Sequence, residues 1–218
     1  MKSFTPFRAA IFAAACFTGL ASASVILLDS RAGLLTDAPG TTVNITAHPL
    51  WEASNPLNPG DPSDTSAVWI SYADTGFGGS HFQPFEGTTP IVSIFDSFTS
   101  GAGLLNLNVW ADDSADVLLD GAYLAHAAFT QSTCSGQPIG CRPQDVGVIS
   151  AALSSGDHTL AFVLYQTGTG TDTTNNPFGL LYSGTATDAV PEPGTGICLL
   201  AGVFLIAAGL LKRRRPTR

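Results

Sequence analysis

The stretch that decides the fold is residues 105–111, which read Leu-Asn-Leu-Asn-Val-Trp-Ala. Every odd-numbered residue is apolar, and the even-numbered ones are polar apart from Trp110. Successive side chains of a β-strand point to opposite faces, so this alternation over seven residues predicts a half-buried antiparallel strand. One strand cannot bury its own apolar face, and the pattern therefore requires a second layer of structure.

The rest of the segment from 24 to 189 consists of short apolar runs bounded by Gly, Pro, Asn, Asp or Ser. These runs predict further strands at 25–28, 42–46, 67–72, 91–98, 117–119, 123–125, 146–153, 158–166 and 178–187. Residues 55–66 are expected to form a long loop, and Asp112-Asp113-Ser114 a turn. Asp120-Gly121 predicts a tight hairpin, because glycine accepts a positive φ.

This many strands without a soluble helix predict an all-β fold, an antiparallel two-sheet sandwich. A jelly-roll arrangement is our first choice and an immunoglobulin-like one the alternative. We also expect two apolar helices outside the sandwich, namely an N-terminal signal helix and one C-terminal transmembrane helix.

The first 23 residues have the pattern of a secretory signal peptide. Lys2 and Arg8 give a positive start, residues 9–20 are an apolar run, and Ala21-Ser22-Ala23 offers Ala21 and Ala23 to signal peptidase. The run is too short to span about 30 Å of hydrocarbon. We therefore expect export through the Sec translocon and a mature chain that begins at Ser24.

A second apolar run, residues 194–211, has about the minimum length of a transmembrane helix. It is followed by a basic stub, residues 212–218, which contains Lys212, Arg213, Arg214 and Arg215. Basic residues beside a membrane span stay in the cytoplasm. The predicted orientation is therefore a folded domain, residues 24–189, outside the membrane and a basic stop inside.

The motif Val190-Pro191-Glu192-Pro193-Gly194 stands directly before this span. The two prolines hold the peptide extended, as a protease requires. Residues 190–218 resemble the PEP-CTERM sorting signal of Gram-negative bacteria, also known as the ice-binding-protein C-terminal domain. The resemblance implies cleavage by exosortase, a membrane cysteine peptidase, and a final place at the cell surface or in the biofilm matrix. The alternative is a plain tail anchor with a chance Pro-Glu-Pro.

Between its two ends the chain is strongly acidic. Residues 24–189 carry sixteen Asp and Glu against Arg31 and Arg142, a formal net charge of −14, and no lysine. Such a surface repels nucleic acid and anionic lipid. It suits a soluble extracellular protein, a cation binder or a partner of neutral glycans.

Cys134 and Cys141 are the two cysteines of the exported domain, and turn-forming residues separate them. In an oxidising compartment this spacing predicts a local disulfide. The rival interpretation, half of a metal site, lacks a second pair of Cys or His residues.

Residues 110–121, Trp-Ala-Asp-Asp-Ser-Ala-Asp-Val-Leu-Leu-Asp-Gly, resemble a stretch of discoidin-like, galactose-binding-type sandwiches. Residues 67–71 and 156–162 resemble two other strands of that class, although Asp157 or His158 stands where asparagine is usual. The resemblance implies a sandwich fold. Sugar binding is common but not universal among such domains, so function does not follow from fold.

Two groups of residues are candidates for ligand contact. Trp110, on the polar side of its strand, could stack on a sugar ring or could pack beneath a loop. Asp112, Asp113 and Asp116 could bind calcium, which prefers hard oxygen ligands, but a solvated turn would also favour aspartate. No other cofactor is indicated.

The sequence identifies no catalytic residue, since zinc-hydrolase spacings of histidine and a Gly-x-Ser-x-Gly elbow are both missing. We therefore expect a non-catalytic cell-surface or biofilm-matrix protein that associates with extracellular polysaccharide. The alternative is a glycan-active enzyme with two placed carboxylates. Ice binding is a third hypothesis, suggested by the second name of the tail and by the threonine content.

Overall fold

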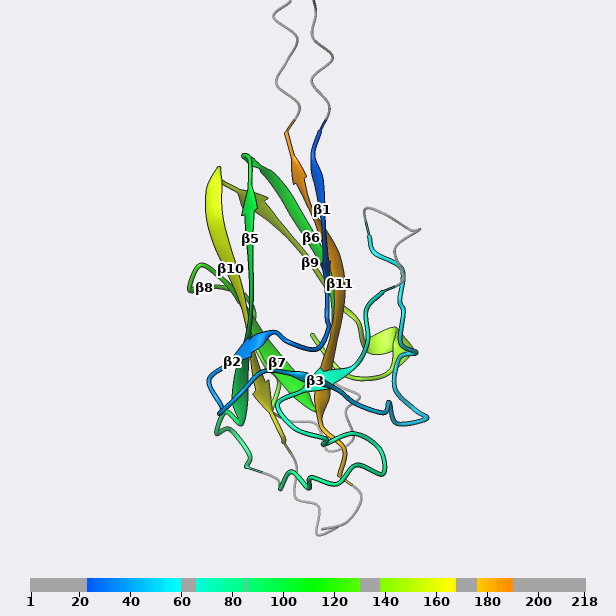
Figure 1. Cartoon of the computed structure of the whole chain (residues 1–218). Coiled ribbons are helices and arrows are strands. Elements are labelled where there is room, and N and C mark those ends of the chain that lie inside the picture. Colours follow the sequence, from blue (N-terminus) through cyan, green and yellow to red (C-terminus); the bar gives the residue numbers. More distant parts are fainter. Residues whose placement is uncertain (1–22, 60–65, 85, 130–137, 168–175, 190–218) are drawn as a thin grey trace, which may run out of the picture. The chain divides into compact units, whose positions relative to one another are not determined.

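The computed structural model describes residues 23–59, 66–84, 86–129, 138–167 and 176–189 (Figure 1). Residues 23–189 form one compact unit. None of the described helical segments has the length and apolar character of a membrane span. Ala21, Cys134, the sorting motif, the 194–211 segment and the basic stub lie outside the described residues.

The described strands form two antiparallel sheets. Sheet A contains β1 (Val25–Asp29), β3 (Val43–Asn44), β4 (Ile70–Ser71), β6 (Gly103–Asp112), β9 (Gly147–Leu153) and β11 (Gly179–Asp188). Sheet B contains β2 (Leu35–Thr36), β5 (Val92–Ser100), β7 (Ser114–Leu119), β8 (Ala122–Ala125) and β10 (Gly156–Tyr165). A short 3-10 helix, η1 (Pro143–Asp145), precedes β9.

Strand order confirms the predicted two-sheet sandwich. Sheet A runs β3-β4-β11-β6-β9, with β1 also on β11, and sheet B runs β2-β5-β10-β7-β8. From β4 to β7, and again from β8 to β11, successive strands alternate between the two sheets. The two sheets are thus built together in the winding of a jelly roll.

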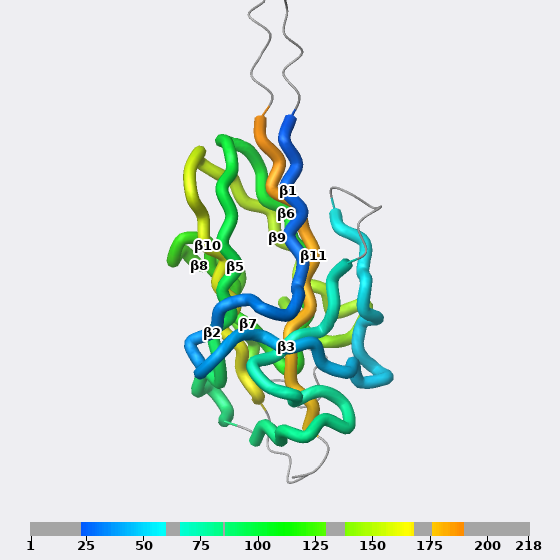
Figure 2. The backbone as a smooth tube through the Cα atoms, in the orientation of Figure 1, coloured from blue at the N-terminus to red at the C-terminus, as the bar shows by residue number. Residues whose placement is uncertain are grey.

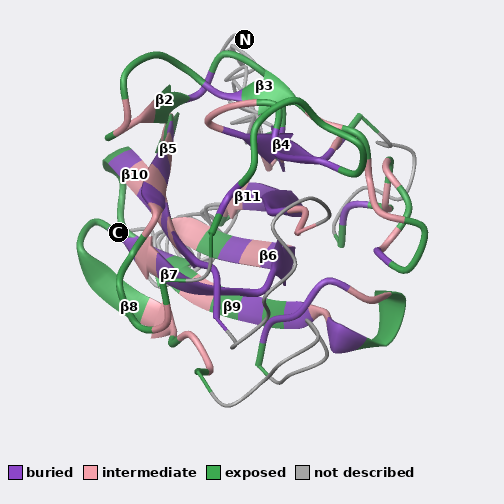
Figure 3. Ribbon diagram, turned by 90° about the horizontal axis from the view of Figure 1, so that it is seen from below, coloured by how far each residue is buried: buried purple, intermediate pink, exposed green. Residues whose placement is uncertain are grey.

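The alternation predicted for β6 is present. Its four odd-numbered apolar residues from Leu105 to Ala111 have no exposed surface, and buried residues likewise alternate with less buried ones along β10 (Figure 3). The hairpin prediction also holds, because Asp120 and Gly121 have φ values of 50° and 82°.

Two local predictions are wrong. The 67–72 run gives only the two-residue β4, because Val68 and Trp69 bond to Ser30 and Ile45, which lie outside the strands, rather than continuing a ladder. Asp112-Asp113-Ser114 is not a turn within one sheet. β6 ends in sheet A at Asp112, β7 begins in sheet B at Ser114, and the chain crosses between the sheets at Asp113.

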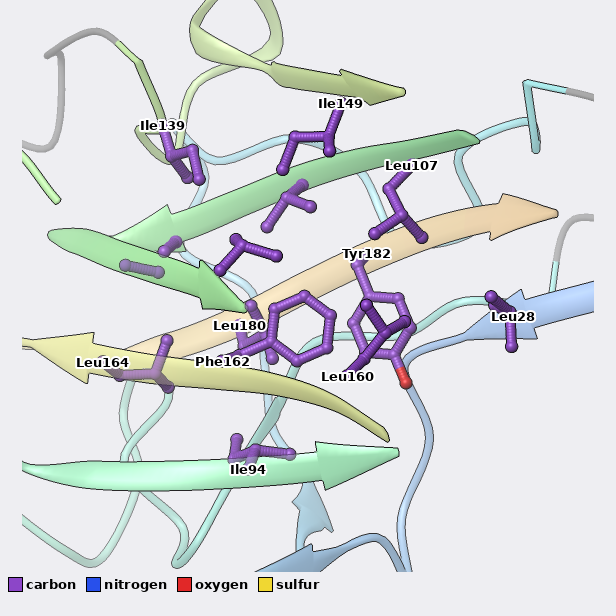
Figure 4. Close-up of a cluster of buried hydrophobic side chains, with 14 of the residues drawn as sticks. Leu28, Ile94, Leu107, Ile139, Ile149, Leu160, Phe162, Leu164, Leu180 and Tyr182 are labelled. Atoms are coloured by element: carbon purple, nitrogen blue, oxygen red, sulfur yellow. The ribbon is translucent and has the colours of Figure 1, made fainter. Parts of the chain in front are cut away.

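The main core lies between the two sheets. Phe162 of β10 and Tyr182 of β11 stack across the interface, with ring centroids 4.4 Å apart and planes 23° apart (Figure 4). Both side chains are fully buried. This aromatic pair therefore joins sheet B to sheet A at the centre of the core.

A polar link joins the two sheets beside this pair. The Tyr182 hydroxyl donates to Asp96 Oδ2 at 2.7 Å, and Arg31 Nη2 donates to Asp96 Oδ1 at 3.1 Å. Asp96 lies on β5 and is 3% exposed. Burial, and then the Asp96 carboxylate, raise the pKa of Tyr182 well above 10.0. The buried carboxylate is thus paired, as an interior charge must be.

A second core covers the outer face of sheet A. It contains Trp51, Ala67, Trp69, Trp110, Cys141 and Leu181. The rings of Trp51 and Trp69 have centroids 4.2 Å apart. Trp69 Nε1 donates to the Glu52 carbonyl at 2.8 Å, and the Glu52 amide donates to the Cys141 carbonyl at 2.7 Å. These contacts hold three loop segments together as a layer over the sheet.

Cys141 is fully buried in this second core and is disulfide-bonded. Because its predicted partner, Cys134, lies outside the described residues, the pairing itself stays a prediction.

The first and last strands lie side by side (Figure 2). β1 pairs with β11 from Val25 opposite Thr187 to Asp29 opposite Ser183. The Asp188 amide also donates to the Ser24 carbonyl at 2.9 Å. The two ends of the domain therefore leave the sandwich together.

Replacing Tyr182 by phenylalanine removes one of the partners of the Asp96 carboxylate in the core. We expect the free energy of unfolding, measured by urea denaturation, to fall by about 1–3 kcal/mol. Tyr123→Phe is the matched control, since this tyrosine is 56% exposed, and we expect it to stay within about 0.5 kcal/mol of wild type. Equal losses in the two variants would contradict the role of the Tyr182 hydroxyl.

Candidate ligand-binding site

Trp110 does not lie on an open surface. It is 4% exposed, belongs to the second core and is the register partner of Leu181. The period of β6 does direct its side chain away from the main core, but the loop layer covers that face. The prediction that Trp110 stacks on a sugar is therefore wrong, and the alternative, packing beneath a loop, holds.

The three predicted calcium ligands are buried but are not brought together. Asp112 and Asp113 stand at the crossing between the sheets, and Asp116 follows on β7. Ala115 and Val117 point into the main core, so Asp116 points outward from sheet B. Asp112 instead contacts the side chain of Trp51, in the second core on sheet A.

No three His, Cys, Asp or Glu side chains in the described part of the chain are grouped to hold a metal ion. The predicted site of Asp112, Asp113 and Asp116 is thus not formed. The solvated turn, our alternative, is also wrong, because these three residues are only 5–7% exposed.

Asp112 and Asp113 form a buried carboxyl pair. The side chain of Asp112 bonds to that of Asp113 and to Trp51. Burial, and then the charge of Asp113, raise the pKa of Asp112 well above 3.8, although the bond from Trp51 acts in the opposite direction. Burial therefore favours the protonated form of Asp112, and with exposures of 7% and 5% the Asp112–Asp113 pair is turned away from solvent.

Asp116 anchors the segment that follows β8. Its Oδ1 accepts from the Ala127 amide at 2.7 Å, and its Oδ2 accepts from the Tyr165 hydroxyl at 2.8 Å. Ser114 Oγ accepts from the Ala128 amide at 2.9 Å. Two outward residues of β7 thus hold residues 126–129 against the outer face of sheet B.

This anchoring presents an aromatic patch, which we define as Tyr123, His126, Phe129 and Tyr165. The rings of Tyr123 and His126 stack at 4.4 Å, and Phe129 meets Tyr165 edge-on at 5.0 Å. Tyr123 is 56% and Phe129 43% exposed, whereas Tyr165 is buried. Exposed rings on a fixed support are typical of surfaces that bind flat or amphipathic ligands.

A groove of about 670 Å³ lies next to the patch, between the terminal strands of the two sheets. It is lined by Leu124 and Ala125 of β8, by His126 and Pro138, and by residues 146–150, which include the start of β9. A smaller hollow of about 80 Å³ lies among residues 75–82, Asn176 and Pro177. Neither lining contains a carboxylate, so neither hollow supplies the facing acids of a glycosidase.

Asp120, at the tip of the β7–β8 hairpin, pairs with the buried His158 of β10. His158 Nδ1 is 2.7 Å from Asp120 Oδ2, and its Nε2 is 3.1 Å from the Ser154 carbonyl oxygen. The bond to Asp120 is the main cause that raises the pKa of His158 above 6.5, against the effect of burial. The same bond lowers the pKa of Asp120 below 3.8. Both imidazole nitrogens thus face acceptors, as protonated histidine requires.

Tyr123, His126 and Phe129 were not among the predicted site residues. In the sequence Tyr123 follows a hairpin turn and precedes Leu124 and Ala125. That pattern is equally typical of a core tyrosine, and only the terminal position of β8 in its sheet leaves the ring exposed.

No family model matches the chain, and no curated protein matches its sequence. Among solved structures, the chain is similar to a GH26-CBM35 β-(1,4)-mannanase of Podospora anserina at 12% identity and a TM-score of 0.37. That match covers 78% of this chain but only 29% of the mannanase.

It is also similar to a family 35 carbohydrate-binding module from Clostridium thermocellum, at 11% identity and a TM-score of 0.33, covering 75% of this chain and 98% of the module. A third match is the carbohydrate-binding module CBM36 in complex with calcium and xylotriose, at 9% identity and a TM-score of 0.26. It covers 51% of this chain and 93% of the module. Similarities of this size do not indicate what this chain binds.

The His158–Asp120 pair predicts a pH dependence of stability. Because the pKa of His158 in the folded state lies above 6.5, the folded state holds a proton that the unfolded state releases above that pH. The stabilisation is complete below pH 6.5 and is lost as the pH rises through the folded pKa. As the pH rises through this range, the free energy of unfolding should fall less in His158→Gln than in wild type. Urea denaturation at a series of pH values measures this difference.

His126→Gln, a change at an exposed imidazole, serves as the control and should keep the wild-type dependence on pH. If the free energy of unfolding changes equally with pH in wild type and His158→Gln, the His158–Asp120 pair is not the cause of the pH dependence.

Proposed function

We propose that this chain is a non-catalytic exported protein of the bacterial cell surface or biofilm matrix, and that its sandwich domain associates with extracellular polysaccharide through the aromatic patch. One observation carries the binding proposal. Tyr123 stacks on His126 and Phe129 packs on Tyr165, and the exposed rings of His126 and Phe129 flank two backbone amides that Asp116 and Ser114 hold in place.

The patch has the chemistry that a sugar ring requires. A pyranose presents a face of C–H groups, which packs on an aromatic ring, and a rim of hydroxyls, which bond to polar groups. Tyr123 and Phe129 offer the rings, and His126 offers ring nitrogens beside the groove. Since the domain has a formal net charge of −14 and no lysine, we propose a neutral glycan rather than an anionic one.

The support of the patch also favours binding. Tyr123 belongs to a strand, and two side-chain hydrogen bonds hold the segment that carries His126 and Phe129. A preformed site loses little conformational entropy when a ligand binds. Weak contacts to single sugar residues can then add up along a polymer.

Export and sorting rest on the two ends of the chain. We propose that signal peptidase cleaves residues 1–23 after Sec-dependent export and that residues 190–218 hold the protein in the inner membrane of a Gram-negative bacterium. An exosortase-type peptidase then cuts near Pro191-Glu192-Pro193 and releases residues 24–189 to the surface. The coincidence of motif, apolar run and basic stub supports this proposal.

Tyr123→Ala and Phe129→Ala should weaken binding to neutral matrix polysaccharide by about tenfold or more, measured by affinity electrophoresis or a glycan array. The reason is the loss of an exposed ring surface without loss of core packing. Phe77→Ala is the matched control, since Phe77 is 44% exposed outside the patch, and it should bind like wild type. Unchanged binding in both patch variants, with unchanged thermal unfolding, would rule out the patch as the site.

Replacing both Pro191 and Pro193 by alanine should block release of the tail in the native host, because the extended peptide that a protease binds is lost. Mass spectrometry of the surface fraction should find wild-type protein without residues 212–218 and the double variant retained in membranes. Mature wild-type protein that still carries the basic stub would contradict the sorting proposal.

A further inference from the structure

Strand β9 forms an unprotected edge of sheet A. It pairs with β6 alone, and no backbone hydrogen bond joins its outer side to another described segment. Its seven residues read Gly-Val-Ile-Ser-Ala-Ala-Leu, without a charge or a proline. Edge strands of natural proteins usually carry such residues, because a bare edge pairs with other chains. Within the part of the chain that the structure describes, β9 is therefore open to strand addition.

The side chains on one face of β9 are also exposed. Val148 is 75% exposed, more than any other large apolar residue in the described part of the chain, and Ser150 and Ala152 are exposed as well. The groove of about 670 Å³ runs beside residues 146–150. There is therefore open space beside this end of β9, with Leu124, Ala125, His126 and Pro138 on the other wall of the groove.

We propose that β9 pairs antiparallel with β9 of a second copy of this chain, about a two-fold axis that passes at Ser150. The strand is complementary to itself in this register, since each larger apolar residue meets a small one. The resulting cross-strand pairs are Ser150 with Ser150, Ile149 with Ala151, Val148 with Ala152, and Leu153 with Gly147. A two-fold interface requires such self-complementarity, and cross-strand pairs stabilise a sheet.

The distribution of charge favours a second copy at this edge. Two domains of formal net charge −14 repel each other. Residues 146–153 carry no charge, and the adjacent Asp145 is buried. Contact along β9 thus brings two acidic domains together without placing carboxylates opposite each other. Salt screens the remaining repulsion, so dimerisation should strengthen as ionic strength rises.

The test is sedimentation equilibrium of the protein recovered from the surface of its host, at about 0.05 M and 0.5 M NaCl. We expect a monomer–dimer equilibrium whose dissociation constant falls at least about threefold in the higher salt. Ser150→Lys should weaken the dimer by about tenfold or more, because two lysines would meet at the two-fold axis.

Ser97→Lys is the matched control. Ser97 is an exposed serine on β5, an inner strand of sheet B, and its hydroxyl lies 3.3 Å from that of Thr159. Ser150 likewise bonds to a neighbouring strand, through Asn106 Oδ1 at 2.9 Å. The control makes the same change of charge on the other sheet, away from β9, and its dimer should be at least as stable as that of wild type.

Urea denaturation of Ser150→Lys should match Ser97→Lys, which separates loss of pairing from loss of folding. The proposal is overturned if wild type stays monomeric in both salts, or if Ser150→Lys dimerises like wild type. It is also overturned if Ser150→Lys abolishes polysaccharide binding by a monomeric wild type, since β9 would then hold a glycan. Failure of the Tyr123→Ala test leaves this proposal untouched, because the two surfaces use different residues.

Discussion

The structure depends on the burial of β11 on both of its faces. Leu180 and Tyr182 point into the main core, and Leu181, between them, points into the second core. Antiparallel sheets commonly leave one face to water, but here loops from three parts of the chain must cover sheet A. The backbone is correspondingly crowded, since a Cβ on Gly184 would lie 2.4 Å from the Asn106 carbonyl oxygen. Only glycine fits there.

The strands could be predicted from the sequence because each one is visible in its own residues, as a short apolar run or an alternation of apolar and polar residues. The apolar positions of β6, the hairpin at Asp120-Gly121 and the long strands β5, β9, β10 and β11 all follow from neighbouring residues. The environment of Trp110 does not, since its cover comes from Trp51 and Trp69, far away in the sequence. The alternation along a strand predicts which face of the sheet a side chain is on. Whether other segments bury that side chain depends on contacts between residues distant in the sequence.

The acidic cluster shows a second limit of the same kind. Asp112 and Asp116 have the spacing of neighbours on one surface, but the chain changes sheet between them, so one belongs to sheet A and the other to sheet B. Asp96, Asp112, Asp116 and Asp120 all accept or share hydrogen bonds with groups of the protein itself. Part of the formal charge therefore maintains the fold, and the exposed rings of the aromatic patch, rather than the acids, form the candidate contact surface.

The side-by-side position of the first and last strands has a consequence for the order of assembly. β1, β4 and β6 all take β11 as a neighbour, so sheet A stays in separate pieces until residues 179–188 have emerged from the ribosome. The contacts that complete the domain join residues more than 150 positions apart, and such long loops close slowly. The domain should therefore complete its fold only after its last strand has been synthesised.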